Sequence, residues 1–174
     1  MKKTLLLLFA VLLAQSVYSQ EGISFQKGKY NEYLVKTTGD RFIVYNIANP
    51  YAKVVNRYNP DPDVNSPAIY ISDRDSVLAF ARKKVYSYFG LSDETKSADK
   101  VALIRIGSDF TGKIVEVYFA YSVVKEPIPI PVLEEIETYI KQTCTVIFPR
   151  EHPFFIGASY VTCSVDIYPI PFAR

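Results

Sequence analysis

A four-residue turn between two apolar runs constrains the fold of this chain more than any other feature. Asp109-Phe110-Thr111-Gly112 places an Asp that can bond its own backbone ahead of a Gly that tolerates a positive φ. The runs on either side of the turn, Val101–Ile106 and Ile114–Ser122, are rich in β-branched and aromatic residues. The sequence therefore predicts a β-hairpin at the centre of the fold.

The register of this hairpin follows from its turn. If Ser108 faces Lys113, then Arg105 lies opposite Glu116, and such a pair of opposite charges stabilises a hairpin by about 0.2–1 kcal/mol. The other face, which we expect the helices to cover, carries Ile104, Ile106, Val115 and Val117. A slip of one residue would move Arg105 into the core, so the register is strongly specified.

Two amphipathic helices flank the hairpin. Arg74–Phe89 has apolar residues at spacings of three and four, with Asp73 as its N-cap and Gly90 just after its end. The second helix, Pro131–Cys144, begins at a proline and carries an apolar stripe for burial. We expect its outer face to hold Glu134, Glu135, Glu137 and Lys141.

The order of the predicted elements defines the fold class. A short strand at Ala68–Ile71 precedes the first helix, and Tyr160–Tyr168 is a returning strand after the second helix. This β-α-β-β-α-β order predicts an α+β fold, in which an antiparallel sheet has two helices on one face. Two further β-rich runs, around Thr37-Thr38-Gly39-Asp40, predict an N-terminal β-hairpin extension.

The chain divides into three parts. Residues 1–19 are predicted to be a signal peptide, with cleavage between Ser19 and Gln20, because two lysines precede a short apolar run. The alternative is a retained membrane anchor, but a spanning helix needs about 20 apolar residues and this run is shorter. Residues 20–66 form the β extension, with a loose start at Gln20–Lys29 and a proline-rich loop at its end. Residues 67–174 form the α+β domain.

The charge balance narrows the class of partner. Removal of the signal peptide takes two of the 20 Lys and Arg residues, Lys2 and Lys3, and leaves 18 against 18 Asp and Glu. A neutral chain lacks the basic patch that nucleic acid rewards, and it lacks the charge for electrostatic docking on a membrane. The predicted signal peptide indicates a periplasmic or secreted protein with no membrane span after cleavage, and we expect its partner to be another exported or envelope protein.

Two cysteines remain in the chain, Cys144 and Cys163. The alternation along the last strand points Cys163 to the core, and Cys144 ends the helix that covers this core. A disulfide between them is therefore predicted for an exported protein, and it would stabilise the fold by about 3 kcal/mol. The alternative is two buried free thiols, which are common in protein cores.

The sequence has no catalytic or metal signature. His152 is the only histidine and has no motif around it, and one His with two separated Cys gives no metal-ligand spacing. Asp61 and Asp63 alternate as in a calcium loop, but turn chemistry explains them better. No glycine-rich phosphate loop is present. We therefore predict no catalytic residue, no cofactor and no metal, and an enzyme that uses an unrecognised carboxylate pair is the weakest of three alternatives.

Tyrosine is the one unusual component of the composition, with 14 residues in a chain that has no tryptophan. Tyrosines supply contact area for glycans and proteins, and they are also ordinary residues of β-strands. The N-terminal third is crowded with them: Tyr30, Tyr33, Tyr45, Tyr51, Tyr58 and Tyr70. These tyrosines are the candidate contacts for a glycan or small ligand.

The second half of the chain resembles the C-terminal domain of TonB-type energy transducers. The matching features are a helix, a hairpin with an Asp-x-x-Gly turn, a second helix, a proline, a glycine before the last strand, and a terminal phenylalanine. Here they are Val77–Phe89, Val101–Ile106, Asp109, Gly112, Ile114–Ser122, Val132–Cys144, Pro149, Gly157, Val161–Tyr168 and Phe172. The chain is also similar in style to small exported proteins of unknown function from Gram-negative gut bacteria.

The resemblance implies a binding mode in which a partner peptide pairs with an open sheet edge. The proline pairs Pro127/Pro129 and Pro169/Pro171 would protect some edges and leave another open. Our prediction is an exported, non-enzymatic protein-interaction module. The alternative is a glycan or small-ligand binding protein that uses the N-terminal tyrosines.

Overall fold

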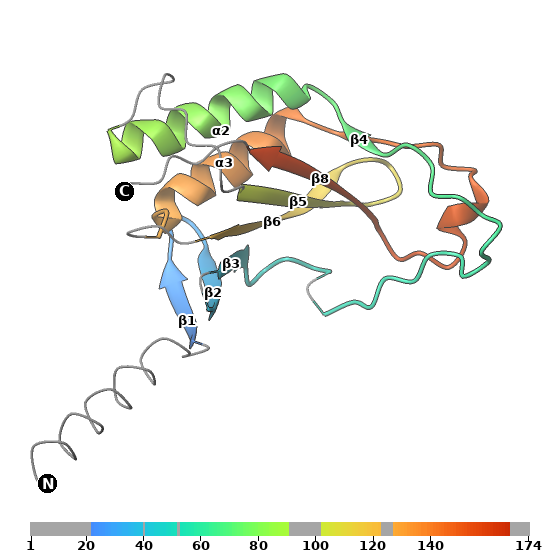
Figure 1. The fold of residues 1–174 in the computed structure, drawn as a ribbon, viewed down its shortest axis with the longest axis horizontal. Helices are drawn as coiled ribbons and strands as arrows, with labels where there is room; N and C mark the ends of the chain where they lie inside the picture. Colours follow the sequence, from blue (N-terminus) through green and yellow to red (C-terminus); the bar gives the residue numbers. More distant parts are fainter. Residues whose placement is uncertain (1–21, 40, 52, 91–101, 123–126, 168–174) are drawn as a thin grey trace, which may run out of the picture.

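The computed structural model describes residues 22–39, 41–51, 53–90, 102–122 and 127–167. They form a six-stranded antiparallel sheet in the order β1-β2-β3-β6-β5-β8 (Figure 1). The strands are β1 (Gly22–Lys27), β2 (Glu32–Thr38), β3 (Arg41–Asn46), β5 (Ala102–Ser108), β6 (Ile114–Ser122) and β8 (Val161–Ile167).

Two helices, α2 (Arg74–Phe89) and α3 (Ile130–Thr143), cover one face of this sheet (Figure 1). Helix α3 packs against β6, and α2 packs against α3 and β8. The largest fully buried side chains of the core come from both helices and from five strands: Tyr33, Val44, Val77, Ile104, Ile106, Val117, Leu133, Ile136, Ile140, Val161 and Val165. The predicted α+β class with both helices on one face is therefore confirmed.

Three short elements complete the fold. Strand β4 (Tyr70–Ile71) pairs with β7 (Val146–Ile147) in a separate two-stranded sheet, and the 3-10 helix η1 (Pro153–Phe155) precedes β8. The strand predicted before the first helix thus exists, but it lies outside the main sheet. The main sheet is extended instead by the N-terminal strands, which join it where β3 pairs with β6.

The N-terminal strands continue the main sheet. Strand β3 pairs with β6, and Tyr33, Val35 and Val44 belong to the same buried core as the helices. Strands on both sides of residue 66 therefore contribute to one sheet. The prediction of a loose start was wrong, because β1 occupies most of that segment and pairs with β2 along its whole length.

The predicted turn is present, with Asp109 as its anchor. The Asp109 carboxylate accepts hydrogen bonds from the backbone N–H groups of Thr111 and Lys113, at 2.8 and 3.1 Å. Gly112 has φ +88°, and a Cβ atom there would lie 2.5 Å from the carbonyl oxygen of Val146. The turn therefore requires glycine for both its conformation and its packing.

The predicted register of the hairpin was wrong by two residues. Arg105 pairs with Tyr118, and Gly107 pairs with Glu116. One residue of the shift arises at the turn, where Ser108 pairs with Ile114 and not with Lys113, and the other at a β-bulge between Gly107 and Ser108, where Val115 is an extra residue on β6. Beyond the bulge, a shift of two residues keeps each side chain on its predicted face. Ile104, Ile106 and Val117 are accordingly buried beneath the helices, as predicted, and Arg105 is exposed on the other face. Next to the turn the prediction fails, because Ile114 pairs with Ser108 and is buried, and Val115, predicted beneath the helices, is the half-buried extra residue of the bulge.

The predicted disulfide is absent, because Cys144 and Cys163 are both buried free thiols. Cys163 lies on β8 opposite Ile106, and burial raises the pKa of its thiol to about 11. The sulfur of Cys144 lies 3.3 Å from the hydroxyl of Thr143 instead. The inward orientation of both residues was correct, but this orientation alone does not bring two sulfur atoms together.

A long segment from Ile47 to Ile69, of which all but residue 52 is described, is here called the crossing segment. It leaves β3 on the side of the sheet away from the helices and then turns round the end of the sheet to reach β4 (Figure 1). Polar side chains fix it to the approach to β8. The Asn56 amide bonds the backbone at Ser159 and Tyr160, and the Tyr58 hydroxyl accepts from the N–H of Thr162 at 3.3 Å. The crossing segment therefore covers the start of the β8 edge.

No helix in the part of the chain that the structure describes is long and apolar enough to cross a membrane. The predicted signal peptide, with its cleavage point at Ser19 and Gln20, lies outside the described residues, as do Pro169 and Pro171.

Candidate binding sites

The sheet has an open face, opposite the helices, that carries a row of apolar side chains. Phe25, Leu34, Tyr45 and Tyr118 pair across four successive strands, and Arg105 on β5 ends the row. These residues alternate with buried neighbours such as Val35 and Val44, so they point away from the core. The row joins the edge strand β1 to the centre of the open face.

A pocket of about 330 Å³ lies on this face, where the crossing segment approaches β3 and β6. We call it the tyrosine pocket, because half of its lining residues are tyrosines. The lining consists of Ile43, Tyr45, Asn49, Tyr51, Val54, Glu116, Tyr118 and Tyr160. A volume near 300 Å³ is at the lower end of the range for ligand pockets, so the pocket suits a small ligand.

Glu116 is the only carboxylate in the lining, and it is nearly inaccessible, with 5% of its surface exposed. Its Oε2 atom accepts a hydrogen bond from the N–H of Tyr51 at 3.0 Å, and no described residue bonds its Oε1 atom. Burial raises the pKa of Glu116 above its ordinary 4.5, and the Tyr51 N–H and the charge of Lys141 oppose this shift only in part. The carboxylate is therefore poorly compensated and has a free acceptor.

Asn49 contributes a second incompletely bonded group. Its Nδ2 atom donates to the carbonyl oxygen of Val117 at 3.2 Å, which fixes the crossing segment to β6. Its Oδ1 atom is buried and has no hydrogen-bond partner among the residues that the structure describes. An unsatisfied buried acceptor costs about 1–3 kcal/mol, which a suitable ligand donor would recover.

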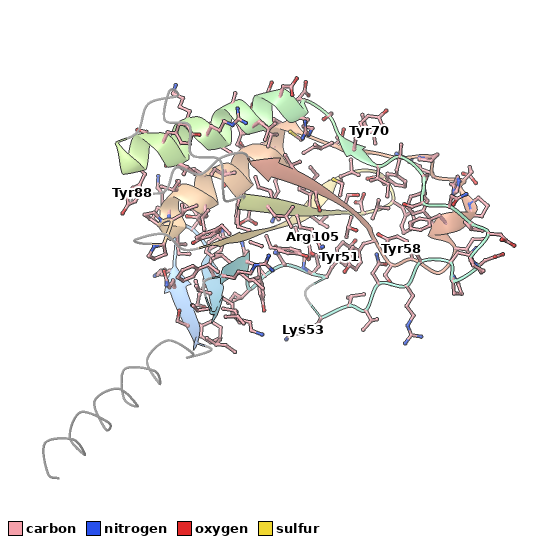
Figure 2. The ribbon with its side chains drawn as sticks, in the orientation of Figure 1. Tyr51, Lys53, Tyr58, Tyr70, Tyr88 and Arg105 are labelled. Carbon is pink, nitrogen blue, oxygen red and sulfur yellow. The ribbon has the colours of Figure 1, made fainter. Side chains whose placement is uncertain are left out.

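Aromatic rings form the walls of the tyrosine pocket. Tyr51 and Tyr160 stack with ring centroids 4.3 Å apart and planes 5° from parallel. The guanidinium of Arg105 lies 5.5 Å from the centroid of the Tyr118 ring. Figure 2 shows Tyr51 and Arg105 on the side of the sheet away from the helices.

The second candidate site is the outer edge of β1. All six of its residues are exposed, including Ile23 at 65% and Phe25 at 63%. Gly28 N–H donates to the carbonyl of Asn31 at 2.8 Å, so in the alternating antiparallel pattern the backbone groups of Ile23, Phe25 and Lys27 face outward. No described residue bonds these groups.

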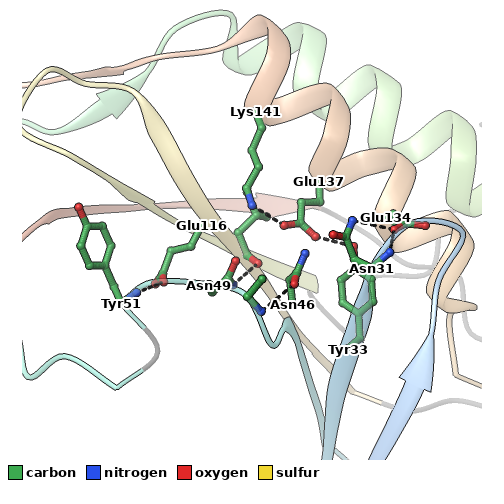
Figure 3. A network of polar contacts seen from close by, with 11 residues as sticks. Asn31, Tyr33, Asn46, Asn49, Tyr51, Glu116, Glu134, Glu137 and Lys141 are labelled. Atoms are coloured by element: carbon green, nitrogen blue, oxygen red, sulfur yellow. Dashed lines mark hydrogen bonds and ion pairs between the residues drawn. The ribbon is translucent and has the colours of Figure 1, made fainter.

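Two other buried glutamates lie on α3, where the sequence predicted an outer face. Glu134 accepts from the backbone N–H groups of Lys29, Tyr30 and Asn31 and from the Asn31 amide. Glu137 accepts from the Tyr33 hydroxyl at 2.6 Å and pairs with Lys141 at 2.6 Å (Figure 3). These carboxylates are buried because the β1–β2 hairpin folds back onto α3, over 100 residues away in the sequence.

Hydrogen bonding lowers the pKa of Glu134, whereas the pKa of Glu116 is raised. Burial alone would raise the pKa of Glu134, but the Asn31 amide and the three backbone N–H groups outweigh it and lower the pKa below its ordinary 4.5. The carboxylate of Glu134 is therefore a structural clamp on the β1–β2 turn.

The other polar residues singled out in the sequence have structural surroundings. His152 caps η1, since its Nδ1 atom accepts from the N–H of Phe154 at 3.2 Å. Asp61 accepts from the N–H of Asp63 at 3.0 Å in an Asx turn. Within the described residues, no group of three or more His, Cys, Asp or Glu side chains is placed to hold a metal ion.

Only two of the six N-terminal tyrosines, Tyr45 and Tyr51, line the tyrosine pocket. Tyr118 and Tyr160 complete it from β6 and from the approach to β8, and sequence analysis did not single them out. Tyr118 could have been found from the sequence, because it lies two residues after Glu116 and therefore on the same face of the predicted strand.

These features define a small α+β protein with an open sheet face, a pocket on that face and an exposed edge strand. A solved structure of a DUF5043 family protein from Bacteroides uniformis is similar in fold, with a TM-score of 0.60 and 16% sequence identity. The match covers 88% of this chain and 93% of that chain.

No protein-family model matches the chain, and no curated protein matches it in sequence. The comparisons give the resemblance to TonB C-terminal domains no support. The fold itself departs from the predicted arrangement, because three N-terminal strands extend the main sheet and β4 pairs outside it. The similar structure comes from a gut bacterium, as the likeness in style suggested.

Proposed function

We propose that this protein is an exported, non-enzymatic interaction module that takes up a strand of another exported or envelope protein at the outer edge of β1. The observation that carries this proposal is the combination of an unpaired edge with two large exposed apolar side chains, Ile23 and Phe25. Exposed edges of this kind recruit partner strands unless they are blocked. Export to the periplasm or beyond rests on the predicted signal peptide.

The partner segment is an extended strand with alternating apolar residues. Its backbone would bond the outward groups of Ile23, Phe25 and Lys27, and its apolar side chains would continue the row that Phe25 begins on the open face. The other edge of the sheet, β8, has fewer free backbone groups for a partner strand, because the N–H of Thr162 already donates to Tyr58 in the crossing segment.

Two variants distinguish the contribution of the β1 backbone to partner binding from that of its side chains. Phe25→Pro removes an outward N–H without removing a bond to β2, so we expect the fold to persist and strand addition to fail. Phe25→Thr keeps this N–H and loses the ring, so it should weaken binding by about tenfold or less.

A photo-crosslinking residue at position 23 of the exported protein would identify the partner segment, which is then synthesised as a peptide. Binding should protect the amides of Ile23 and Phe25 from hydrogen exchange in the purified protein. Protection confined to other strands, or unchanged binding by the Phe25→Pro variant, would refute the proposal.

A second candidate function is small-ligand binding in the tyrosine pocket. The observation that favours it is Glu116, a buried carboxylate with a free acceptor between tyrosine walls. Glycosidic catalysis needs two carboxylates flanking the reacting bond, and Glu116 is the single one among the lining residues. We therefore place binding, rather than catalysis, at this pocket.

A further inference from the structure

We propose that the tyrosine pocket binds a neutral pyranose ring, with Glu116 accepting hydrogen bonds from the hydroxyl groups of the sugar. This inference rests on the second candidate function and names the chemical class of the ligand. It is independent of strand addition at β1, because the two sites lie on different strands of the sheet.

The volume of the pocket limits the ligand to about one ring. Ligand pockets commonly measure about 300–1,000 Å³, and the tyrosine pocket has about 330 Å³. Its lining comes from β3, β6, the crossing segment and Tyr160, and the pocket is partly open to solvent. One residue of a longer glycan could therefore enter while its neighbours remain in solvent.

The unsatisfied groups of the pocket define what the ligand must bring. The Oδ1 atom of Asn49 is a buried acceptor without a partner among the described residues. The Oε1 atom of Glu116 is a second acceptor, in a residue that is 5% exposed and whose hydrogen bond to Tyr51 uses Oε2. Both residues line the same pocket, so a ligand that satisfies both acceptors must carry at least two hydrogen-bond donors. A carboxylate or phosphate ligand brings no such donors and would meet the charge of Glu116, whereas adjacent sugar hydroxyls match both acceptors.

The aromatic walls fit the remaining surface of a sugar ring. A pyranose has an apolar face of C–H groups, and tyrosine rings offer flat apolar faces with hydroxyl tips that can bond the ring edge. Tyr45 and Tyr118 are neighbours in the same cross-strand pair, and Tyr51 and Tyr160 stack nearly parallel to each other. The pocket therefore combines packing surface with polar groups at its rim.

A carboxylate between aromatic rings would also suit an organic cation. Two positive charges argue against such a ligand. The guanidinium of Arg105 already lies over the ring of Tyr118, 5.5 Å from its centroid, and the charge of Lys141 already acts on Glu116. The ring of Tyr118 therefore already faces a cation, and the charge of Glu116 is already partly balanced, so a cationic ligand would gain less from this pocket than from an uncompensated carboxylate.

Saturation-transfer NMR on the purified protein tests this assignment. Irradiation of the tyrosine ring protons should transfer saturation to the ring protons of a methyl pyranoside, with methyl α-D-glucoside, α-D-mannoside and β-D-galactoside as the three probes. Choline and acetate are the cation and anion probes, and we expect no transfer to either.

Two variants locate the binding in the tyrosine pocket. Glu116→Gln keeps an acceptor for the Tyr51 N–H and removes the charge, so it should weaken pyranoside binding by about tenfold. Tyr118→Leu keeps the bulk of the wall and removes the ring, and we expect a similar loss. Tyr70→Phe, at an exposed tyrosine outside the pocket, is the matched control and should bind normally.

The possible outcomes test the chemical class of the ligand and the location of the binding site separately. Transfer to choline or acetate, but to no pyranoside, would overturn the saccharide assignment while leaving ligand binding at the pocket intact. No transfer to any probe would overturn both the assignment and the second candidate function. Equal pyranoside binding by Glu116→Gln and the unchanged protein, with Tyr118→Leu also unaffected, would place the sugar elsewhere and refute the inference.

Discussion

Glu134 and Glu116 are buried to the same degree, at 3% and 5% exposure, but their carboxylates are bonded very differently. Glu134 accepts from three backbone N–H groups and one side-chain amide, whereas Glu116 accepts from a single backbone N–H (Figure 3). The bonding moves the pKa of Glu134 down, while burial moves the pKa of Glu116 up. A buried carboxylate thus stabilises a fold only where the chain completes its hydrogen bonds.

The difference also assigns roles to the two regions. Around Glu134, every acceptor position serves the attachment of the β1–β2 hairpin to α3, which supports the core. Around Glu116, the protein leaves an acceptor free beside a pocket, at a cost in stability. Incomplete bonding of a buried polar group is a common mark of a site that is completed by a ligand.

The largest expected effect comes from Glu134→Ala. The substitution leaves the backbone N–H groups of Lys29, Tyr30 and Asn31 without their acceptor, and we expect the free energy of unfolding to fall by about 2–3 kcal/mol. The measurement is urea unfolding at pH 7, with Glu135→Ala on the exposed face of α3 as the matched control. An equal, small effect of both substitutions would break the comparison.

The pH dependence of this effect has a definite sign. Because the pKa of Glu134 is lowered in the folded state, its contribution is present above its ordinary pKa of 4.5 and is lost as the pH falls through the folded-state value. The stability difference between the unchanged protein and Glu134→Gln should therefore shrink in acid.

Tyr33→Phe tests the second contact between the hairpin and α3. The substitution removes the hydroxyl that donates to Glu137 and leaves this buried carboxylate with Lys141 alone. We expect a loss of about 1–2 kcal/mol in the free energy of unfolding. A Tyr30→Phe control, at a side chain that is 76% exposed, should change little, and a loss of equal size there would contradict the role of the hydroxyl.

Glu116→Gln should have the smallest effect, with the opposite sign. Its raised pKa means that the charged form is disfavoured in the folded state, so its contribution is favourable below the ordinary pKa of 4.5 and is lost as the pH rises through the folded-state value. Removing the charge should therefore stabilise the protein at pH 7, by about 1 kcal/mol or less.

Thermal unfolding at pH 7 and at pH 4 measures this effect. The gain from Glu116→Gln should be visible at pH 7 and should shrink at pH 4. Destabilisation at pH 7 of the size expected for Glu134→Ala would show that both glutamates are structural clamps, and the comparison between them would fail.

The sequence by itself determined the central hairpin, the two helices and the face on which Arg105 lies. The turn at Asp109–Gly112, the helix that ends at Gly90 and the two strands of the central hairpin were all predicted, because local turn chemistry and apolar spacing specify them. The face of Arg105 was also correct in spite of the wrong register. Side chains alternate with a period of two along a strand, and the turn and the bulge together shifted the pairing of Arg105 by two residues.

Only the tertiary structure decided which polar groups are buried and what completes their bonding. The spacing on α3 placed Glu134 and Glu137 outside, and they are buried because a hairpin from the other end of the chain covers them. The tyrosine pocket likewise joins side chains from residue 43 to residue 160. Apolar periodicity and secondary-structure propensity depend only on residues that are close in the sequence. The contacts of the two glutamates and of the pocket depend on which distant strands pair with each other, so the sequence pattern does not reveal them.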